Sequence, residues 1–161
     1  NFNTSAVTDM SDMFNGAGKT AMTTLTLGDN FNTSSVQNMS GMFQDFAGNS
    51  STMITLDLGE KFYTTSATNM TNMFNGCGLV GMTSLDLGPA FTNIPNVNTD
   101  FVTNCGKSGA VIYAPESIYN DMIHFKLSTD SSTTIQYAQG TINPNRFLES
   151  SASLAIRYAV S

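Results

Sequence analysis

Internal repetition constrains the fold of this 161-residue chain more than any other feature of its sequence. The copies begin at four phenylalanines: Phe2, Phe31, Phe62 and Phe91. We number the copies one to four, with the ranges 2–30, 31–61, 62–90 and 91–115. A unit of about 29 residues cannot bury its own apolar face, so the copies are expected to stack on one another.

Two apolar periods coexist within each copy. Val7, Met10 and Phe14 lie at i, i+3 and i+7, which is typical of one face of a short helix. Leu25-Thr26-Leu27 then alternates as a half-buried strand does, and Gly28 follows where the chain must turn. The equivalent positions predict columns of core residues: Met10/Met39/Met70, Met13/Met42/Met73, Phe14/Phe43/Phe74 and Met22/Met53/Met82.

These periods predict an α/β repeat solenoid over residues 1–115. We expect a right-handed coil of about four turns, with a parallel β-sheet on one face and short helices on the other. The two extra residues of copy two fall in Gly48-Asn49-Ser50-Ser51, where a polar loop absorbs added length at little cost.

Copy four keeps the motif only in part. We expect Phe101 to continue the column that ends at Phe74, although the methionines of the motif are missing. We align the segment Val111–Pro115 with Leu85–Pro89, so Ile112 is expected to replace an exposed Asp86. A degenerate terminal copy is typical of an array that must cover an open end.

Residues 116–161 lack the repeat and are expected to form a C-terminal cap and tail. Residues 116–125 follow a proline and show helical spacing, which predicts a short lid helix. Alternating segments at 133–137 and 153–160 predict a pair of tail strands. Because the chain begins within the repeated phrase and lacks an initiator methionine, we take it as a fragment of a longer protein.

The repeated phrase carries a resemblance to a known family. Residues 33–43 read Thr-Ser-Ser-Val-Gln-Asn-Met-Ser-Gly-Met-Phe, and copy three continues with Gly76-Cys77 and Leu85-Asp86-Leu87. From about Phe2 to Pro115 the chain resembles the BspA-type leucine-rich repeats of bacterial surface proteins. The resemblance implies an extracellular protein, held by a cell-wall or lipid anchor outside this sequence, that takes part in adhesion or protein binding.

Composition excludes two classes of function. Thr, Ser and Asn fill 56 of 161 positions, only 11% of residues are charged, and the net charge is −6. Without a basic patch the chain cannot release counterions from a phosphate backbone, so nucleic-acid binding is excluded. No apolar run approaches the roughly 20 residues of a membrane-spanning helix, so we expect no membrane insertion by this fragment.

The largest regular surface of the predicted fold is the exposed face of the sheet, where repeat proteins commonly bind. Tyr63 is added because it stands where other copies have Asn. The candidate binding residues are Thr24, Thr26, Thr55, Asp57, Ser84, Asp86 and Tyr63. Asp57 and Asp86 share one column, and two like charges one strand apart repel each other by roughly 0.2–1 kcal/mol.

The sequence offers few residues that could form a catalytic or metal-binding site. His124 is the single histidine and lies in the expected lid, which does not favour a Ser-His-Asp triad. Cys77 and Cys105 are one copy apart, so they are either a disulfide or two inward-facing free thiols. Scattered carboxylates form no calcium loop, and we expect no metal and no cofactor.

We therefore expect a non-enzymatic surface module that binds a host or bacterial surface protein, or a glycan. The alternative is a structural stalk that spaces another domain from the cell wall. The uncovered side of copy one is expected to allow end-to-end self-association, because an open edge invites pairing.

Overall fold

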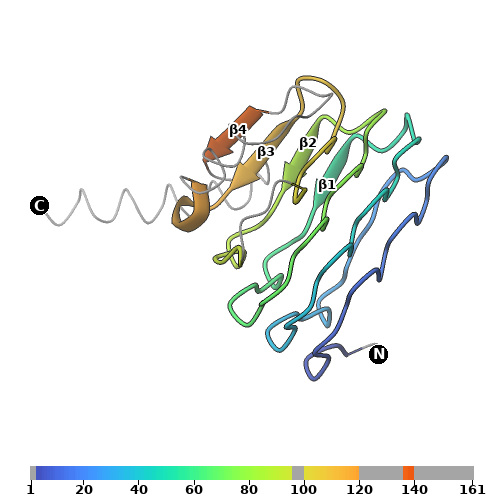
Figure 1. The fold of residues 1–161 in the computed structure, drawn as a ribbon. Coiled ribbons are helices and arrows are strands. Elements are labelled where there is room, and N and C mark those ends of the chain that lie inside the picture. Colours follow the sequence, from blue (N-terminus) through green and yellow to red (C-terminus); the bar gives the residue numbers. More distant parts are fainter. Residues whose placement is uncertain (1–2, 96–99, 120–135, 140–161) are drawn as a thin grey trace, which may run out of the picture.

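The computed structural model describes residues 3–95, 100–119 and 136–139. Within them, four short strands form one parallel sheet: β1 (Thr55–Asp57), β2 (Ser84–Asp86), β3 (Val111–Ala114) and β4 (Gln136–Gln139). The strands pair in chain order, β1-β2-β3-β4. Figure 1 shows the copies as elongated loops side by side, with copy one at one end of the row and β4 at the other.

The strand predicted in copy one is not formed. Leu25–Leu27 has no regular structure, whereas the equivalent residues of copies two and three overlap β1 and β2, each of which begins and ends one residue earlier. Leu25 and Leu27 are only partly buried, while Leu56 and Leu85 are 0% and 1% exposed. Among the described residues copy one packs against one neighbouring copy, copy two, so less apolar burial offsets the entropy of ordering its strand here.

The short helix predicted in the first half of each copy is also absent from residues 3–95, which form successive tight turns there. Alternate N–H groups donate hydrogen bonds to the neighbouring copy instead of to a carbonyl of their own segment. In copy one, the N–H groups of Met10, Asp12 and Phe14 each donate to a carbonyl of copy two at 2.9 Å. Those of Met13 and Asn15 donate to the carbonyl three residues back. This alternation leaves no continuous run of i→i−4 bonds.

Positive φ angles recur at fixed motif positions and exclude a right-handed helix there. One column of the motif has φ of 56° at Asp12, 63° at Gly41 and 58° at Asn72. The i, i+3, i+7 spacing therefore does bring one side of the segment to the core, but through a chain of turns.

Short polar side chains link neighbouring copies. The Thr4 hydroxyl donates to the carbonyl of Asn32 at 2.8 Å, and the N–H of Asn32 donates back to that hydroxyl at 2.7 Å. In the next copy, the Thr33 hydroxyl donates to the carbonyl of Tyr63 at 2.7 Å. The abundance of Thr, Ser and Asn thus follows in part from one inter-copy contact repeated along the row.

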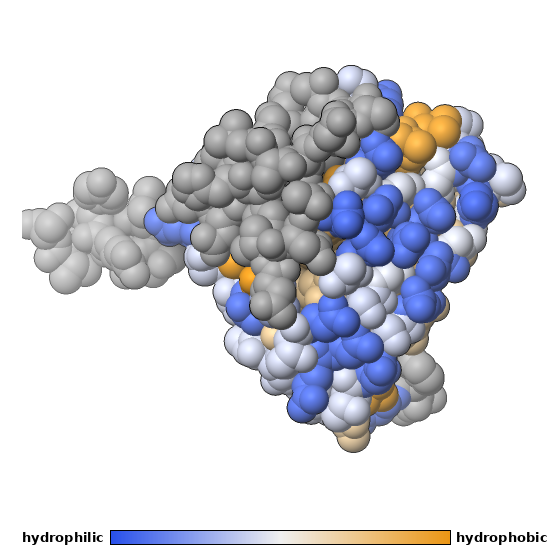
Figure 2. Space-filling model, in the orientation of Figure 1, coloured by the Kyte–Doolittle hydropathy of each residue, from blue (hydrophilic) through white to orange (hydrophobic). Residues whose placement is uncertain are grey.

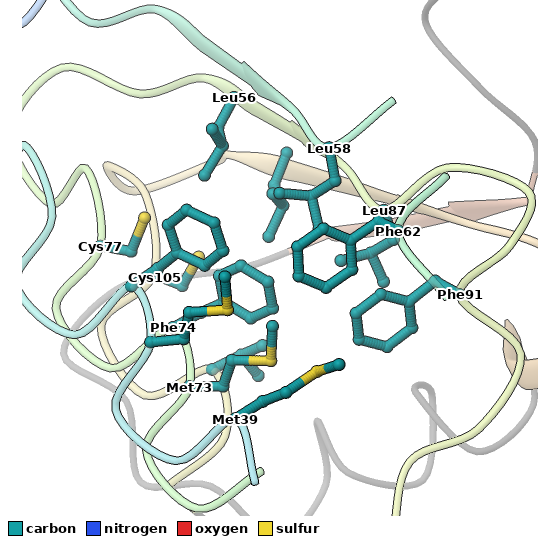
Figure 3. Packing of buried hydrophobic residues seen from close by; sticks show 14 of the residues in the cluster. Met39, Leu56, Leu58, Phe62, Met73, Phe74, Cys77, Leu87, Phe91 and Cys105 are labelled. Atoms are coloured by element: carbon teal, nitrogen blue, oxygen red, sulfur yellow. The ribbon is translucent and has the colours of Figure 1, made fainter. Parts of the chain in front are cut away.

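Columns of Met, Phe and Leu fill the space between the sheet and the turns (Figure 3). Phe14, Phe43 and Phe74 stack in succession, with ring centroids 5.2 and 5.5 Å apart and interplanar angles of 19° and 4°. Phe62 and Phe91 belong to a second stacked column, with centroids 6.0 Å apart. Each aromatic side chain therefore contacts its equivalents in the neighbouring copies.

Copy four differs from its predicted register by one residue, both at the turns and in the sheet. The N–H of Phe74 donates to the carbonyl of Phe101, whereas in earlier copies the acceptor is the residue before the equivalent phenylalanine. Val102 therefore lies opposite Phe74, and the Phe101 ring meets the Phe74 ring edge-on at 84°. In the sheet, Ile112 pairs with Leu85 and is buried. It does not replace Asp86.

The predicted cap is seen in part. Residues 116–119 are helical, and Ile118 is buried in the core cluster. The rest of the predicted lid helix, together with His124, lies outside the described residues. β4 pairs with β3 and overlaps the predicted tail strand at 133–137, and the second tail strand lies outside the described residues.

Candidate binding face

The outer face of the sheet is formed by the residues that alternate with the buried Leu56, Leu85 and Ile112. In one row of this face, Thr55 pairs with Ser84, and their hydroxyl oxygens form a hydrogen bond of 2.9 Å. Both residues are half-buried. This row offers hydroxyl groups to a partner but is already hydrogen-bonded within the sheet.

The second row of the face contains the two carboxylates. Asp57 pairs with Asp86, and each carboxylate accepts a hydrogen bond from the N–H two residues ahead, at 2.8 Å from Gly59 and 2.9 Å from Gly88. Such bonds stabilise the turn that ends each strand. Gly59 and Gly88 have φ angles of 78° and 76°, which residues with a side chain rarely adopt. Both carboxylates therefore have a structural role in the turns.

The prediction that Asp86 is exposed is wrong. Its exposed fraction is 0%, whereas Asp57, one strand nearer the end of the row, is half-buried. Tyr113 of β3 pairs with Asp86 and is half-buried on the same face. The alignment of Pro115 with Pro89 concealed this position of Tyr113, and the run Val111–Ala114 is apolar throughout, so its sequence does not mark which residues face outward.

The remaining predicted residues lie apart from this two-row pattern. Thr24 and Thr26 are exposed, in the irregular part of copy one. Tyr63 follows the buried Phe62 beyond the strand-ending turn and is half-buried, and its carbonyl accepts the Thr33 hydroxyl. Tyr63 is therefore part of the segment that leads to the tight turns and is not in a strand.

A hollow of about 370 Å³ lies where copy one and β1 are not paired. It brings together two of the predicted residues, Thr26 and Asp57, with Leu25, Phe31 and Leu58 at the apolar part of its lining. The full lining is Leu25, Thr26, Leu27, Gly28, Asp29, Phe31, Asp57, Leu58, Gly59, Glu60 and Lys61. This volume is at the low end of the range for small-ligand sites, roughly 300–1,000 Å³.

The charges around the hollow are mixed. The Lys61 ammonium donates to the backbone carbonyl of Asp29 at 2.9 Å and so bridges copies one and two. Asp29, Asp57 and Glu60 contribute carboxylates to the same lining. The hollow can accept a short apolar side chain with a polar or cationic end. Sequence reasoning missed it because it arises from the unpaired strand of copy one.

Cys77 and Cys105 lie at equivalent positions of neighbouring copies, and both are free thiols with an exposed fraction of 0%. Figure 3 shows the two side chains close together in the core. A hydrogen bond with Cys105, together with burial, raises the pKa of the Cys77 thiol well above its ordinary value of 9.0. The folded chain therefore favours the protonated thiol.

We expect two thiols per chain to react with a thiol reagent in denaturant without reductant, and none to react in the folded protein. A raised pKa contributes stability that is complete below the unfolded thiol's pKa and is lost as the pH rises through 9 toward the folded value. The melting temperature should therefore fall from pH 7 to pH 10, and less steeply in the double variant Cys77→Ala, Cys105→Ala. Absence of reactive thiols in denaturant would instead indicate a disulfide.

The described residues hold no group of three or more His, Cys, Asp or Glu side chains placed to bind a metal ion. Over the same part of the chain, no helix has the length and apolar character required to cross a membrane. On the face seen in Figure 2, hydrophilic residues predominate over the described surface, and apolar residues form only small patches.

The described residues thus form a parallel sheet with a polar outer face, and backbone hydrogen bonds join each copy of the motif to the next. The chain belongs to the family described as "Mycoplasma protein of unknown function, DUF285", whose sequence model matches residues 1–83. The match covers copies one and two and most of copy three. Neither the curated proteins nor the solved structures gave a match.

Proposed function

We propose that the chain is a BspA-like leucine-rich-repeat solenoid that binds a protein outside the cell through its sheet face and the adjoining hollow, without catalysing a reaction. The observation that carries the proposal is the hollow, because it joins Thr26 and Asp57 to an apolar surface. A protein side chain with an apolar stem and a polar end matches this combination. The exposed hydroxyls of copy one extend the same surface.

The extracellular location is proposed because the repeated phrase resembles the BspA-type leucine-rich repeats of bacterial surface proteins. The match to DUF285 is compatible with a repeat family but carries no function of its own. The low charge of the chain, with 11% charged residues, fits a contact dominated by hydroxyls and a few carboxylates.

A structural stalk is the second candidate. One observation favours it: the polar groups of the sheet face already have partners, since Thr55 and Ser84 bond to each other and both carboxylates bind glycine N–H groups. A face whose polar groups are already hydrogen-bonded within the chain gains less binding free energy from a partner than a face with unbonded polar groups.

The two candidates are separated by binding to a panel of purified, immobilised host surface proteins and glycans. If the chain is a binding module, at least one member of the panel binds saturably. The variant Thr24→Lys, Thr26→Lys then weakens binding about tenfold or more, because it places two ammonium groups beside the hollow. Both threonines are exposed, so the melting temperature should change little.

The matched control is Thr65→Lys, an exposed threonine of copy three outside the hollow lining and the strands. It should bind as the unmodified chain does. Binding that is lost equally in the control and the double variant, or no binding by any chain, would contradict the proposed module and favour the stalk.

A further inference from the structure

The backbones of Cys77, in copy three, and Cys105, in copy four, are held side by side. Two hydrogen bonds frame them: the N–H of Gly76 donates to the carbonyl of Thr103 at 2.9 Å, and the N–H of Gly106 donates to the carbonyl of Cys77 at 2.7 Å. Backbones paired in this way lie roughly 4.8 Å apart, within the Cα separation of about 4.4–6.8 Å that a disulfide spans. The separation of the two cysteines therefore suits a disulfide.

The one-residue shift of copy four is what brings Cys105 to this place. Val102 lies opposite Phe74, and each cysteine follows three residues further along its own copy. The N–H groups of Cys77 and Cys105 each donate to the carbonyl three residues back at 3.1 Å, so the two residues occupy equivalent turns. Without the shift, Asn104 would stand opposite Cys77.

The two side chains also meet. The thiols of Cys77 and Cys105 are hydrogen-bonded to each other, and both residues are 0% exposed (Figure 3). The equivalent residues of copies one and two are Ala17 and Phe46, so a second thiol adjoins Cys77 only on the side of copy four. This pair of nucleophilic groups takes no part in the proposed binding face.

We propose that Cys77 and Cys105 are a redox pair whose oxidation forms an intrachain disulfide between copies three and four. The described state is the reduced one. The disulfide closes a loop that contains β2, and it joins the copy that carries β2 to the copy that continues into β3. This proposal concerns the core and does not depend on binding by the sheet face.

The oxidant is a small-molecule disulfide, for which glutathione disulfide is the probe. The thiolate of one cysteine attacks a sulfur atom of glutathione disulfide, which forms a mixed disulfide and releases the first glutathione as a thiolate. The thiolate of the other cysteine attacks the protein sulfur of that mixed disulfide, forms the intrachain bond and releases the second glutathione. Two electrons pass from the protein dithiol to the oxidant, and the two glutathione thiolates take up the two cysteine protons.

Burial affects the rate and the equilibrium of this reaction in opposite directions. Both thiols are 0% exposed, and the pKa of the Cys77 thiol is raised, so the folded chain reacts slowly. Once the bond has formed, the stacking of the two copies holds the sulfur atoms together, so folding favours the oxidised state at equilibrium. In the unfolded chain the thiols are accessible, but a flexible loop separates them.

The test equilibrates the full chain with mixtures of glutathione and glutathione disulfide, in native buffer and in concentrated guanidinium chloride. The equilibrium is approached from both the reduced and the oxidised chain. Alkylation traps free thiols, and mass spectrometry identifies the intrachain disulfide by the loss of two hydrogen atoms. We expect the equilibrium constant for oxidation to be about 100-fold greater in the folded chain than in the denatured chain.

Two further measurements follow the same samples. The initial rate of oxidation should be about 100-fold or more lower in native buffer than in denaturant, because both thiols are buried in the folded chain. The oxidised chain should melt about 5 °C or more above the reduced chain, because the bond restricts the unfolded state.

The matched control is Cys105→Ala, Ser108→Cys, which keeps two thiols and a loop of similar length but moves one thiol to an exposed position. In denaturant its oxidation should match that of the unmodified chain. In native buffer its equilibrium constant should be at least tenfold below that of the unmodified chain, because residue 108 does not lie opposite Cys77. Thermal unfolding in the presence of reductant checks that both reduced chains fold.

Equal equilibrium constants in native buffer and in denaturant, or for the unmodified chain and the control, would overturn the proposal. So would mixed disulfides or disulfide-linked dimers in place of the intrachain bond. An oxidised chain that melts no higher than the reduced chain would also contradict it.

Discussion

Met42→Asp should unfold the chain or lower its free energy of unfolding by about 4 kcal/mol or more. The Met42 side chain is 0% exposed and lies in a column between the equivalent methionines of copies one and three. A carboxylate there would be removed from water without a cationic partner, so it would either remain charged at high cost or become protonated. Thermal unfolding followed by circular dichroism measures the effect.

Met13→Asp is the matched control, because it makes the same substitution at the same motif position in copy one. Met13 is 38% exposed, so a carboxylate there stays hydrated. We expect a change within about 0.5 kcal/mol, as for ordinary surface substitutions. If the two variants were destabilised equally, the stacking order that buries Met42 and leaves Met13 at the edge would be wrong.

The contrast between these two methionines shows which structural properties can be predicted from the sequence and which cannot. The repeat predicted the columns correctly, and the inner members of each column are buried as expected. The sequence alone does not give the exposure of each member, because Met13 and Met42 occupy the same motif position, each directly before a phenylalanine. Exposure depends on the place of a copy in the row, which becomes visible only in the fold.

The predicted helix failed for a different reason. Val7, Met10 and Phe14 have helical spacing, but the same spacing also suits a chain of turns that brings every third or fourth residue inward. The decisive groups are the N–H donors, half of which bond to the next copy. A periodicity of side chains does not specify where backbone groups bond.

The binding face was predicted in outline and corrected in detail. The alternation in Leu56-Asp57-Leu58 and Leu85-Asp86-Leu87 placed both carboxylates on the outer side of the strands, yet only Asp57 retains access to solvent. The hollow beside Asp57 could not be predicted, because it depends on the failure of Leu25–Leu27 to pair with β1. Regular pairing in every copy was the reasonable expectation from identical motifs.

The two-residue insertion of copy two has a structural consequence in copy three. The inserted loop includes Ser50 and Ser51, and it packs against the backbone of Gly81. A Cβ atom on residue 81 would overlap the carbonyl oxygen of Ser50 and would lie 2.9 Å from the carbonyl carbon of Ser51. Copies one and two have Ala21 and Thr52 at this motif position, so glycine is needed only where the longer loop is the neighbour.

Gly81→Ala should therefore lower the free energy of unfolding by about 3 kcal/mol, in the upper part of the range for an overpacked core. The neighbouring atoms are backbone, and Ser50 is itself fully buried, with its hydroxyl bonded to the carbonyl of Met22 at 2.7 Å. The loop cannot move away without breaking that contact between copies. Chemical denaturation followed by circular dichroism measures the change.

Gly28→Ala is the comparison variant. Gly28 has φ of 78°, yet a Cβ there meets nothing within 4 Å, so the cost is backbone strain of about 1 kcal/mol. Removing the two inserted residues should then distinguish steric overlap from any other effect of alanine. In a chain shortened by Asn49 and Ser50, Gly81→Ala should cost less than in the full chain. An unchanged cost would mean that the longer loop of copy two is not what requires glycine at residue 81.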